Sequence, residues 1–204
     1  MMTETILKVK NLNFAYKKNI ILKNINVHFQ ENQLYSIYGP SGSGKSTLLY
    51  LLGGLIKDKN KNIIKKDNLK VGFLFQTHNL IKELSIYENI KISQLIKNED
   101  DDEKIYELLK EMGIYHIKNN YPDQISGGEA QRVSFIRTLI ADTKIILCDE
   151  PTASLDTKNK EIIYNIISQY KKNKLIIIAT HDENVKKYSD KTFNLIDGNL
   201  EEGG

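Results

Sequence analysis

One stretch of nine residues, 39–47, constrains the fold more than any other part of the 204-residue chain. It reads Gly-Pro-Ser-Gly-Ser-Gly-Lys-Ser-Thr and fits the phosphate-loop pattern of a glycine, four further residues and Gly-Lys-Ser. The residues before it, 34–38, predict a strand, and residues 45–52 after it predict a helix. A strand, a glycine-rich loop and a helix in this order indicate an α/β fold with a site for phosphate groups.

Each residue type in this loop has a chemical reason. Gly42 and Gly44 let the backbone curl so that successive N–H groups point at phosphate oxygens. Lys45 brings a positive charge to the terminal phosphates, and Ser46 offers a hydroxyl to the magnesium ion that accompanies them. A flexible loop that binds nothing is the weaker interpretation, because strand, loop and helix agree with one another. The residues expected to bind the nucleotide are Gly39, Pro40, Ser41, Gly42, Ser43, Gly44, Lys45, Ser46 and Thr47.

Composition narrows the class of protein. The net charge is only +3, from 29 basic and 26 acidic residues, which argues against a nucleic-acid-binding groove. A single cysteine, Cys148, excludes an internal disulfide and a multi-thiolate metal site, and it fits a reducing cytosol. No apolar run approaches the roughly 18 residues that cross a bilayer, and the N-terminus lacks a signal-peptide pattern. We therefore expect any role at a membrane to require another polypeptide.

The N-terminal part predicts antiparallel strands. Residues 6–9 and 11–16 read as two strands, and alternating apolar residues around Val27 predict a half-buried third strand. Tyr16 ends the second of these strands. It could stack on an adenine ring, although Tyr16 alone favours an ordinary aromatic of the sheet. Residues 57–70 are rich in Lys and Asn and predict a solvated loop with one short strand.

The middle of the chain predicts a helical insert over residues 85 to about 121. Ser85 and Glu88 form a capping box at the start of a helix that runs to about Ile96. The acidic run 99–103 predicts the solvated start of a second helix rather than a metal site, and Gly113 ends that helix.

Two later segments also suggest phosphate chemistry. Gly127 and Gly128 open a helix where glycine is unfavourable, which makes sense if N–H groups there must approach an anion closely. A buried strand, 144–148, ends at Asp149 and Glu150. Asp149 is placed to hold magnesium, and Glu150 to polarise an attacking water. His181 follows the buried strand 175–179, at the sheet edge where nucleotides bind.

The chain resembles the nucleotide-binding subunits of ATP-binding cassette (ABC) transporters over nearly its whole length. The matching parts occur in the family's order: the phosphate loop 39–47, the Q-loop glutamine Gln76, the signature 125–129, the magnesium strand 145–150, the D-loop 154–156 and the switch histidine His181. The resemblance implies one ABC ATP-binding domain over residues 1–204. Its fold would be an α/β P-loop NTPase (RecA-like) core with a mainly parallel sheet, a reduced N-terminal antiparallel β-subdomain and an inserted helical subdomain at about 85–141.

The resemblance also implies roles for individual residues, with ATP and Mg²⁺ as cofactors. The catalytic residues would be Glu150, His181, Gln76 and Lys45. The metal would be held by Ser46, Gln76 and Asp149. In addition to the phosphate loop, Tyr16 would bind ATP by stacking on the adenine. Across a pair of cassettes, ATP would also be bound by Ser126, Gly127, Gly128 and Asp156.

The partners implied are a second cassette, in a homodimer, and integral-membrane permease subunits on separate chains. Such a subunit would lie peripherally on the cytoplasmic face of the cell membrane, with Tyr87 and Glu88 as docking residues. Within the family the chain looks most like the branch for lipoprotein release, macrolide or peptide export and cell division. The alternative function is a soluble single-cassette ATPase, such as the iron–sulfur assembly type, that is not coupled to transport.

Two features depart from the family pattern. Ile125 and Glu129 replace the commoner Leu and Gln of the signature, and a Glu in a first helical turn suits the helix dipole. The interval from Lys45 to Gln76 is 31 positions, which is shorter than the interval usual in the family. We expect this shortening to trim the small β-subdomain and to leave the site residues in place.

Overall fold

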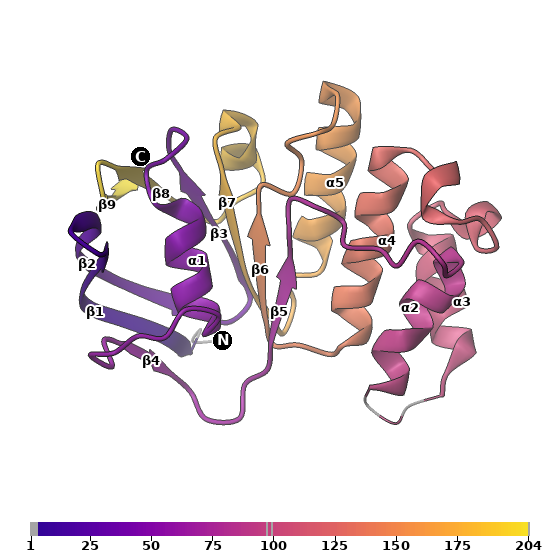
Figure 1. Cartoon of the computed structure of the whole chain (residues 1–204), viewed down its shortest axis with the longest axis horizontal. Helices are drawn as coiled ribbons and strands as arrows, with labels where there is room; N and C mark the ends of the chain where they lie inside the picture. The colour runs from indigo at the N-terminus through magenta and orange to yellow at the C-terminus, as the bar shows by residue number, and fades with distance from the viewer. Residues whose placement is uncertain (1–3, 97, 99, 204) are drawn as a thin grey trace.

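The computed structural model describes residues 4–96, 98 and 100–203, and its centre is a six-stranded sheet in the order β5-β6-β7-β3-β8-β9 (Figure 1). All neighbours in this sheet are parallel except β8 and β9. The strands are β1 (Thr5–Tyr16), β2 (Asn19–Gln30), β3 (Gln33–Tyr38), β4 (Ile63–Lys65), β5 (Val71–Leu74), β6 (Ile145–Asp149), β7 (Leu175–Thr180), β8 (Lys191–Ile196) and β9 (Asn199–Gly203). The mainly parallel α/β core expected from the sequence is confirmed.

Five α-helices and three short 3₁₀ helices are present in the described part of the chain. The α-helices are α1 (Lys45–Gly53), α2 (Ile86–Leu95), α3 (Asp102–Glu111), α4 (Gly127–Ile140) and α5 (Thr157–Gln169), and the 3₁₀ helices are η1 (Tyr115–Ile117), η2 (Pro122–Gln124) and η3 (Glu183–Lys187). None of the helices described is both long and apolar enough to cross a bilayer.

The start of the chain differs from expectation, because β1 is one continuous strand and the predicted pair of strands is wrong. Its pairing with β2 shifts register between Val9 and Leu12, and Asn11 there has a φ of 49°. Asparagine tolerates this left-handed conformation better than most residues, and the Asn26 side chain accepts a hydrogen bond from the Asn11 N–H at 2.9 Å. The polar break in the sequence is therefore a bulge within a strand.

The antiparallel β-subdomain is small. It has the order β2-β1-β4, and β4 contributes only three residues, pairing Leu7 with Lys65. β4 is the one strand that the structure places between α1 and β5, which agrees with the single short strand predicted in residues 57–70.

The parallel sheet brings three strand ends together. β3 lies beside β7, and β7 beside β6, with Tyr38 opposite Thr180 and Asp149 opposite Ala179. The carboxyl ends of parallel strands share one edge of a sheet, which is where α/β proteins bind nucleotides. The phosphate loop, Asp149 at the end of β6, Glu150 directly after it and the histidine after β7 consequently converge.

Helices α2, α3 and α4 lie together on one side of the molecule, opposite the antiparallel sheet (Figure 1). The predicted capping box of α2 is present, since the side chains of Ser85 and Glu88 each bond the other's backbone N–H. α3 begins within the predicted acidic run, capped by Asp101, while Glu99 of that run lies outside the described residues. Gly113 follows α3 with a φ of 68°, as a helix C-terminal glycine requires.

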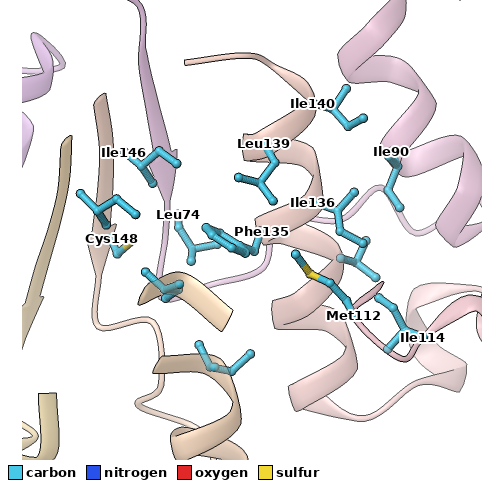
Figure 2. Close-up of a cluster of buried hydrophobic side chains, with 14 of the residues drawn as sticks. Leu74, Ile90, Met112, Ile114, Phe135, Ile136, Leu139, Ile140, Ile146 and Cys148 are labelled. Atoms are coloured by element: carbon cyan, nitrogen blue, oxygen red, sulfur yellow. The ribbon is translucent and has the colours of Figure 1, made fainter. Parts of the chain in front are cut away.

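Buried side chains join this helical part to the central sheet. Figure 2 shows part of the cluster, in which Phe135 and Ile136 of α4 lie between strands β5 and β6 and the other helices. The neighbours drawn there include Leu74, Ile146, Ile90 and Met112. A continuous apolar cluster of this kind fixes α4 relative to the central sheet.

Candidate functional site

The phosphate loop connects β3 to α1 and depends on glycine at three positions. Gly42 and Gly44 have φ values of 81° and 104°, in the region that favours glycine, and Gly44 caps α1. At Gly39 a Cβ atom would lie only 2.2 Å from the Leu195 carbonyl oxygen of β8. The loop therefore curls close against the sheet, with the N-terminus of α1 directed at its centre.

Lys45 folds back over this loop. Its Nζ donates hydrogen bonds to the carbonyl oxygens of Gly39 at 2.8 Å and Pro40 at 3.0 Å, and lies 3.6 Å from Oε1 of Glu150. Only 6% of the lysine side chain is exposed. A buried, fixed ammonium group within the loop is suited to bind phosphate oxygens.

Ser46 and Asp149 meet although 103 residues separate them. The Ser46 hydroxyl donates to Oδ1 of Asp149 at 2.8 Å, and the hydroxyl of Tyr50 donates to Oδ2 of the same carboxylate at 2.9 Å. Burial, followed by the hydrogen bond and the charge of Asp149, raises the pKa of Tyr50 to about 12. Tyr50 thus remains a protonated donor at neutral pH.

These oxygens suit a magnesium ion, which prefers hydroxyl, carboxylate and phosphate oxygen ligands. Within the part of the chain that the structure describes, no group of three or more His, Cys, Asp or Glu residues is arranged to hold a metal. Beside Ser46 and Asp149, such an ion would take phosphate oxygens of a bound nucleotide as ligands.

Glu150 has an unusual backbone, with a φ of 48°, and its N–H donates to the Ala179 carbonyl at 2.8 Å. Its carboxylate accepts a hydrogen bond from the Thr180 hydroxyl at 2.9 Å and lies 2.9 Å from Nδ1 of His181, with 14% of the side chain exposed. Such a conformation is uncommon for a residue other than glycine, and it turns the carboxylate toward the end of β7.

A cavity of about 320 Å³ lies over the phosphate loop. It is lined by Ile21, Ser41, Gly42, Gly44, Lys45, Ser46, Thr47, Gln76 and Glu150. Gln76, which follows β5, thereby faces the same space as Lys45 and Glu150. Residues from three distant parts of the chain converge on one site beside the strand ends.

The signature segment and the D-loop lie elsewhere and share a second surface. Ser126 caps α4 and forms a capping box with Glu129, while Asp156 caps α5 by accepting the Asn159 N–H at 3.0 Å. A Cβ atom on Gly128 would lie 3.3 Å from the side chain of Asn159. The start of α4 therefore packs against the start of α5, and neither lines the cavity over the phosphate loop.

Glu129, a departure from the family pattern, is well accommodated at this surface. Its carboxylate accepts hydrogen bonds from the N–H and the hydroxyl of Ser126 at 2.8 and 2.7 Å. These bonds lower the pKa of Glu129, so it stays ionised in the first turn of α4, where the helix dipole favours negative charge.

Tyr16 stands at the exposed end of β1. The residue is 49% exposed, and its ring packs edge-on against Phe14, with 5.0 Å between the ring centroids. It does not line the cavity over the phosphate loop.

Two contacts in the site were missed by sequence reasoning, those of Tyr50 and Thr180. Tyr50 lies four residues after Ser46 on the predicted helix 45–52, and this spacing places both side chains on one helix face. Thr180 precedes His181 at the end of a predicted strand, so its position was known but not its hydrogen bond to Glu150.

The geometry agrees with three kinds of comparison. A family model described as "ABC transporter" matches residues 22–153. The lipoprotein-releasing system ATP-binding protein LolD of Rickettsia typhi is 37% identical over 98% of this chain and 99% of its own length. LolD of Treponema denticola is 36% identical over 95% and 94%.

Solved structures agree with these sequence relatives. The ATP-binding cassette MJ0796, in a dimeric post-hydrolysis state with ADP and Pi, superimposes with a TM-score of 0.83 and 33% identity over 97% of this chain and 98% of that one. CbiO1 of Clostridium perfringens, part of the ABC transporter complex cbiONQ, gives a TM-score of 0.87 at 30% identity over 98% of this chain and 88% of that one.

Proposed function

The chain belongs to the ABC transporter family, and from this premise we propose what each residue of its nucleotide site does. The protein is the ATP-binding, ATP-hydrolysing subunit of a transporter and works with separate membrane permease subunits. Residues 1–204 would act as one ATP-binding domain with a helical subdomain at about 85–141. The observation that carries the site assignment is the cavity shared by Lys45, Gln76 and Glu150.

ATP would bind with its phosphates in the loop 39–47. The N–H groups of the loop and the N-terminus of α1 face this position, and Lys45 supplies the positive charge. The lysine would exchange its bonds to the Gly39 and Pro40 carbonyls for bonds to phosphate oxygens. Tyr16 would stack on the adenine, which its exposed ring at the end of β1 permits.

Magnesium would be held by Ser46 and Asp149, with Gln76 as a third protein contact from the edge of the same cavity. Bound there, the ion would neutralise charge on the phosphate oxygens. Asp149 is only 5% exposed and already hydrogen-bonded, so its carboxylate is held in place before nucleotide arrives.

Glu150 would act as the general base that orients and deprotonates the attacking water. Thr180 and the backbone N–H of His181 hold its carboxylate, leaving the acid beside Lys45 at the cavity wall. His181 would then stabilise charge that develops at the γ-phosphate, and Gln76 would help to place the water.

We expect Lys45→Ala to weaken ATP binding by roughly two orders of magnitude, because it removes charge-assisted bonds each worth about 1.5–3 kcal/mol. Equilibrium binding of a fluorescent ATP analogue measures this loss. The exposed Lys66, which pairs with Glu4 away from the loop, provides the matched control Lys66→Ala, which should bind as wild type does. Wild-type affinity in Lys45→Ala would refute the assignment of the loop.

The proposed substrate class and the contact with the permease are inferred from the relatives of the chain. Several are subunits of lipoprotein-releasing systems, so we place the transported class among lipoproteins and the protein at the cytoplasmic face of the cell membrane. The helical subdomain and the segment after Gln76 would contact the permease, with Tyr87 and Glu88 of α2 as docking residues. Because these relatives are named as ATP-binding proteins of transport systems, we favour this function over that of the soluble iron–sulfur assembly type.

A further inference from the structure

We propose that Tyr50 is a positioning residue for the magnesium site, because its hydroxyl holds the Asp149 carboxylate in the orientation in which Ser46 and Asp149 together receive the ion. The inference rests on the proposed function of Ser46 and Asp149 as metal-binding residues. Tyr50 belongs to none of the motifs by which the family was recognised.

Both oxygens of Asp149 are held by one helix. Oδ1 accepts from Ser46 at 2.8 Å and Oδ2 from Tyr50 at 2.9 Å, and the two donors lie one turn apart on α1. Rotation of the carboxylate about its Cβ–Cγ bond would break both hydrogen bonds. The pair of donors therefore restricts Asp149 more strongly than Ser46 could alone.

The position of the Tyr50 hydroxyl is itself fixed by packing. Its ring contacts Phe73 and Phe75, with centroid distances of 6.2 and 6.4 Å, and these two phenylalanine rings stack on each other at 5.3 Å. Gly53 makes room for this arrangement, since a Cβ atom there would lie 2.0 Å from the Phe73 ring. A tyrosine held by two aromatic neighbours has little freedom to swing its hydroxyl away from Asp149.

The same rings connect Asp149, through Tyr50, to Gln76, the third proposed metal contact. Phe75 immediately precedes Gln76, so the packing that orients Tyr50 also holds the residue before the glutamine.

Hydrogen bonds to an ionised carboxylate are about twice as strong as those between neutral groups. Partners that orient a metal ligand typically contribute about 10- to 100-fold to metal affinity.

The test uses Tyr50→Phe, which keeps the ring and removes only the hydroxyl. Both this variant and its parent carry Glu150→Gln, so that ATP is not consumed. Free Mn²⁺ is measured by electron paramagnetic resonance during titration of the ATP complex. We expect Mn²⁺ affinity to fall by about tenfold. ATP affinity in EDTA and the melting temperature without metal should stay at the parent's values.

A matched control is Tyr35→Phe, whose lost hydroxyl donates to Oε1 of Gln33 at 2.5 Å, outside the cavity over the phosphate loop. Its Mn²⁺ affinity should equal the parent's. A second readout uses the chain with Glu150 intact: hydrolysis by Tyr50→Phe should be low at limiting Mg²⁺ and should recover as Mg²⁺ is raised. The melting temperature without metal identifies a defect in folding separately, since bound metal and nucleotide can also stabilise a weakened fold.

Two reference variants, Ser46→Ala and Asp149→Asn, separate failure of this inference from failure of the proposed function. If both weaken Mn²⁺ binding while Tyr50→Phe behaves like Tyr35→Phe, only the role of Tyr50 is overturned. If neither weakens Mn²⁺ binding, the metal assignment itself is wrong and the inference fails with it. Tighter Mn²⁺ binding by Tyr50→Phe would show that the hydroxyl competes with the metal, which also overturns the proposal.

Discussion

Replacing Glu150 by glutamine is expected to reduce ATP turnover by roughly two to four orders of magnitude, the usual scale for loss of a general base. Glutamine has nearly the same shape, and its amide oxygen can still accept the hydrogen bond from Thr180. It cannot take a proton from water. The bonds of Lys45 to the phosphates are unaffected, so ATP affinity should stay near that of the wild type.

Turnover is measured as steady-state release of phosphate with Mg²⁺, and affinity by equilibrium binding of ATP. Glu201→Gln on β9 is the control, because it makes the same chemical change at an exposed site and should hydrolyse ATP at the wild-type rate. Full hydrolysis by Glu150→Gln would transfer the role of base to another group. His181, 2.9 Å from the Glu150 carboxylate, is the next candidate.

The elements around the site could be predicted because local chemistry determines them. Ser85 and Ser126 each precede a glutamate by three residues, and both serines cap a helix in the structure. Asp197 and Gly198 form a dipeptide that is typical of a tight hairpin turn, and both have positive φ between β8 and β9. These signals lie within a few residues of one another and need no tertiary contact.

The bulge in β1 could not be predicted in the same way. Asn11 reads locally as a break between two strands, yet the Asn26 side chain from the neighbouring strand bridges it. The contact depends on how β1 and β2 pair, which is tertiary information. The polar residues therefore indicated an irregularity at the right position, but they could not show that it is a bulge within one strand.

The contacts within the site also divide into those that a local motif predicts and those that depend on tertiary structure. Lys45 and Ser46 were assigned from a contiguous motif, whereas the hydrogen bond of Tyr50 to Asp149 spans 99 residues. The interval between Lys45 and Gln76 contributes only β4 to the three-stranded antiparallel sheet, and both of these residues face one cavity. The phosphate loop starts from β3, which belongs to the mainly parallel sheet and not to the β-subdomain.

The largest conformational prediction is that ATP joins two cassettes. Ser126 and Gly128 present a hydroxyl and N–H groups at the start of α4, yet they do not line the cavity that holds Lys45. Asp156 lies on the same surface, through its contact with Asn159. If that surface from one chain covers the phosphate loop of another, two ATP molecules are enclosed and each γ-phosphate is bound from both sides. Hydrolysis would then release the contact and move the attached permease.

Ser126→Arg should abolish this association, because a long cation would occupy the space of the partner's phosphate loop. Ser168→Arg is the matched control, since Ser168 lies at the opposite end of α5 from Asp156 and should not affect association. Both variants must unfold at the same melting temperature as their parent for the comparison to hold, because Ser126 also caps α4.

The most direct measurement is the molar mass of the Glu150→Gln protein by light scattering on a sizing column, with and without ATP. We predict a change from 23.4 kDa to twice that mass with ATP alone, lost in the Ser126→Arg protein and kept in Ser168→Arg. A monomer at saturating ATP and high protein concentration, or normal dimerisation by Ser126→Arg, would contradict ATP-driven pairing of two copies of this chain.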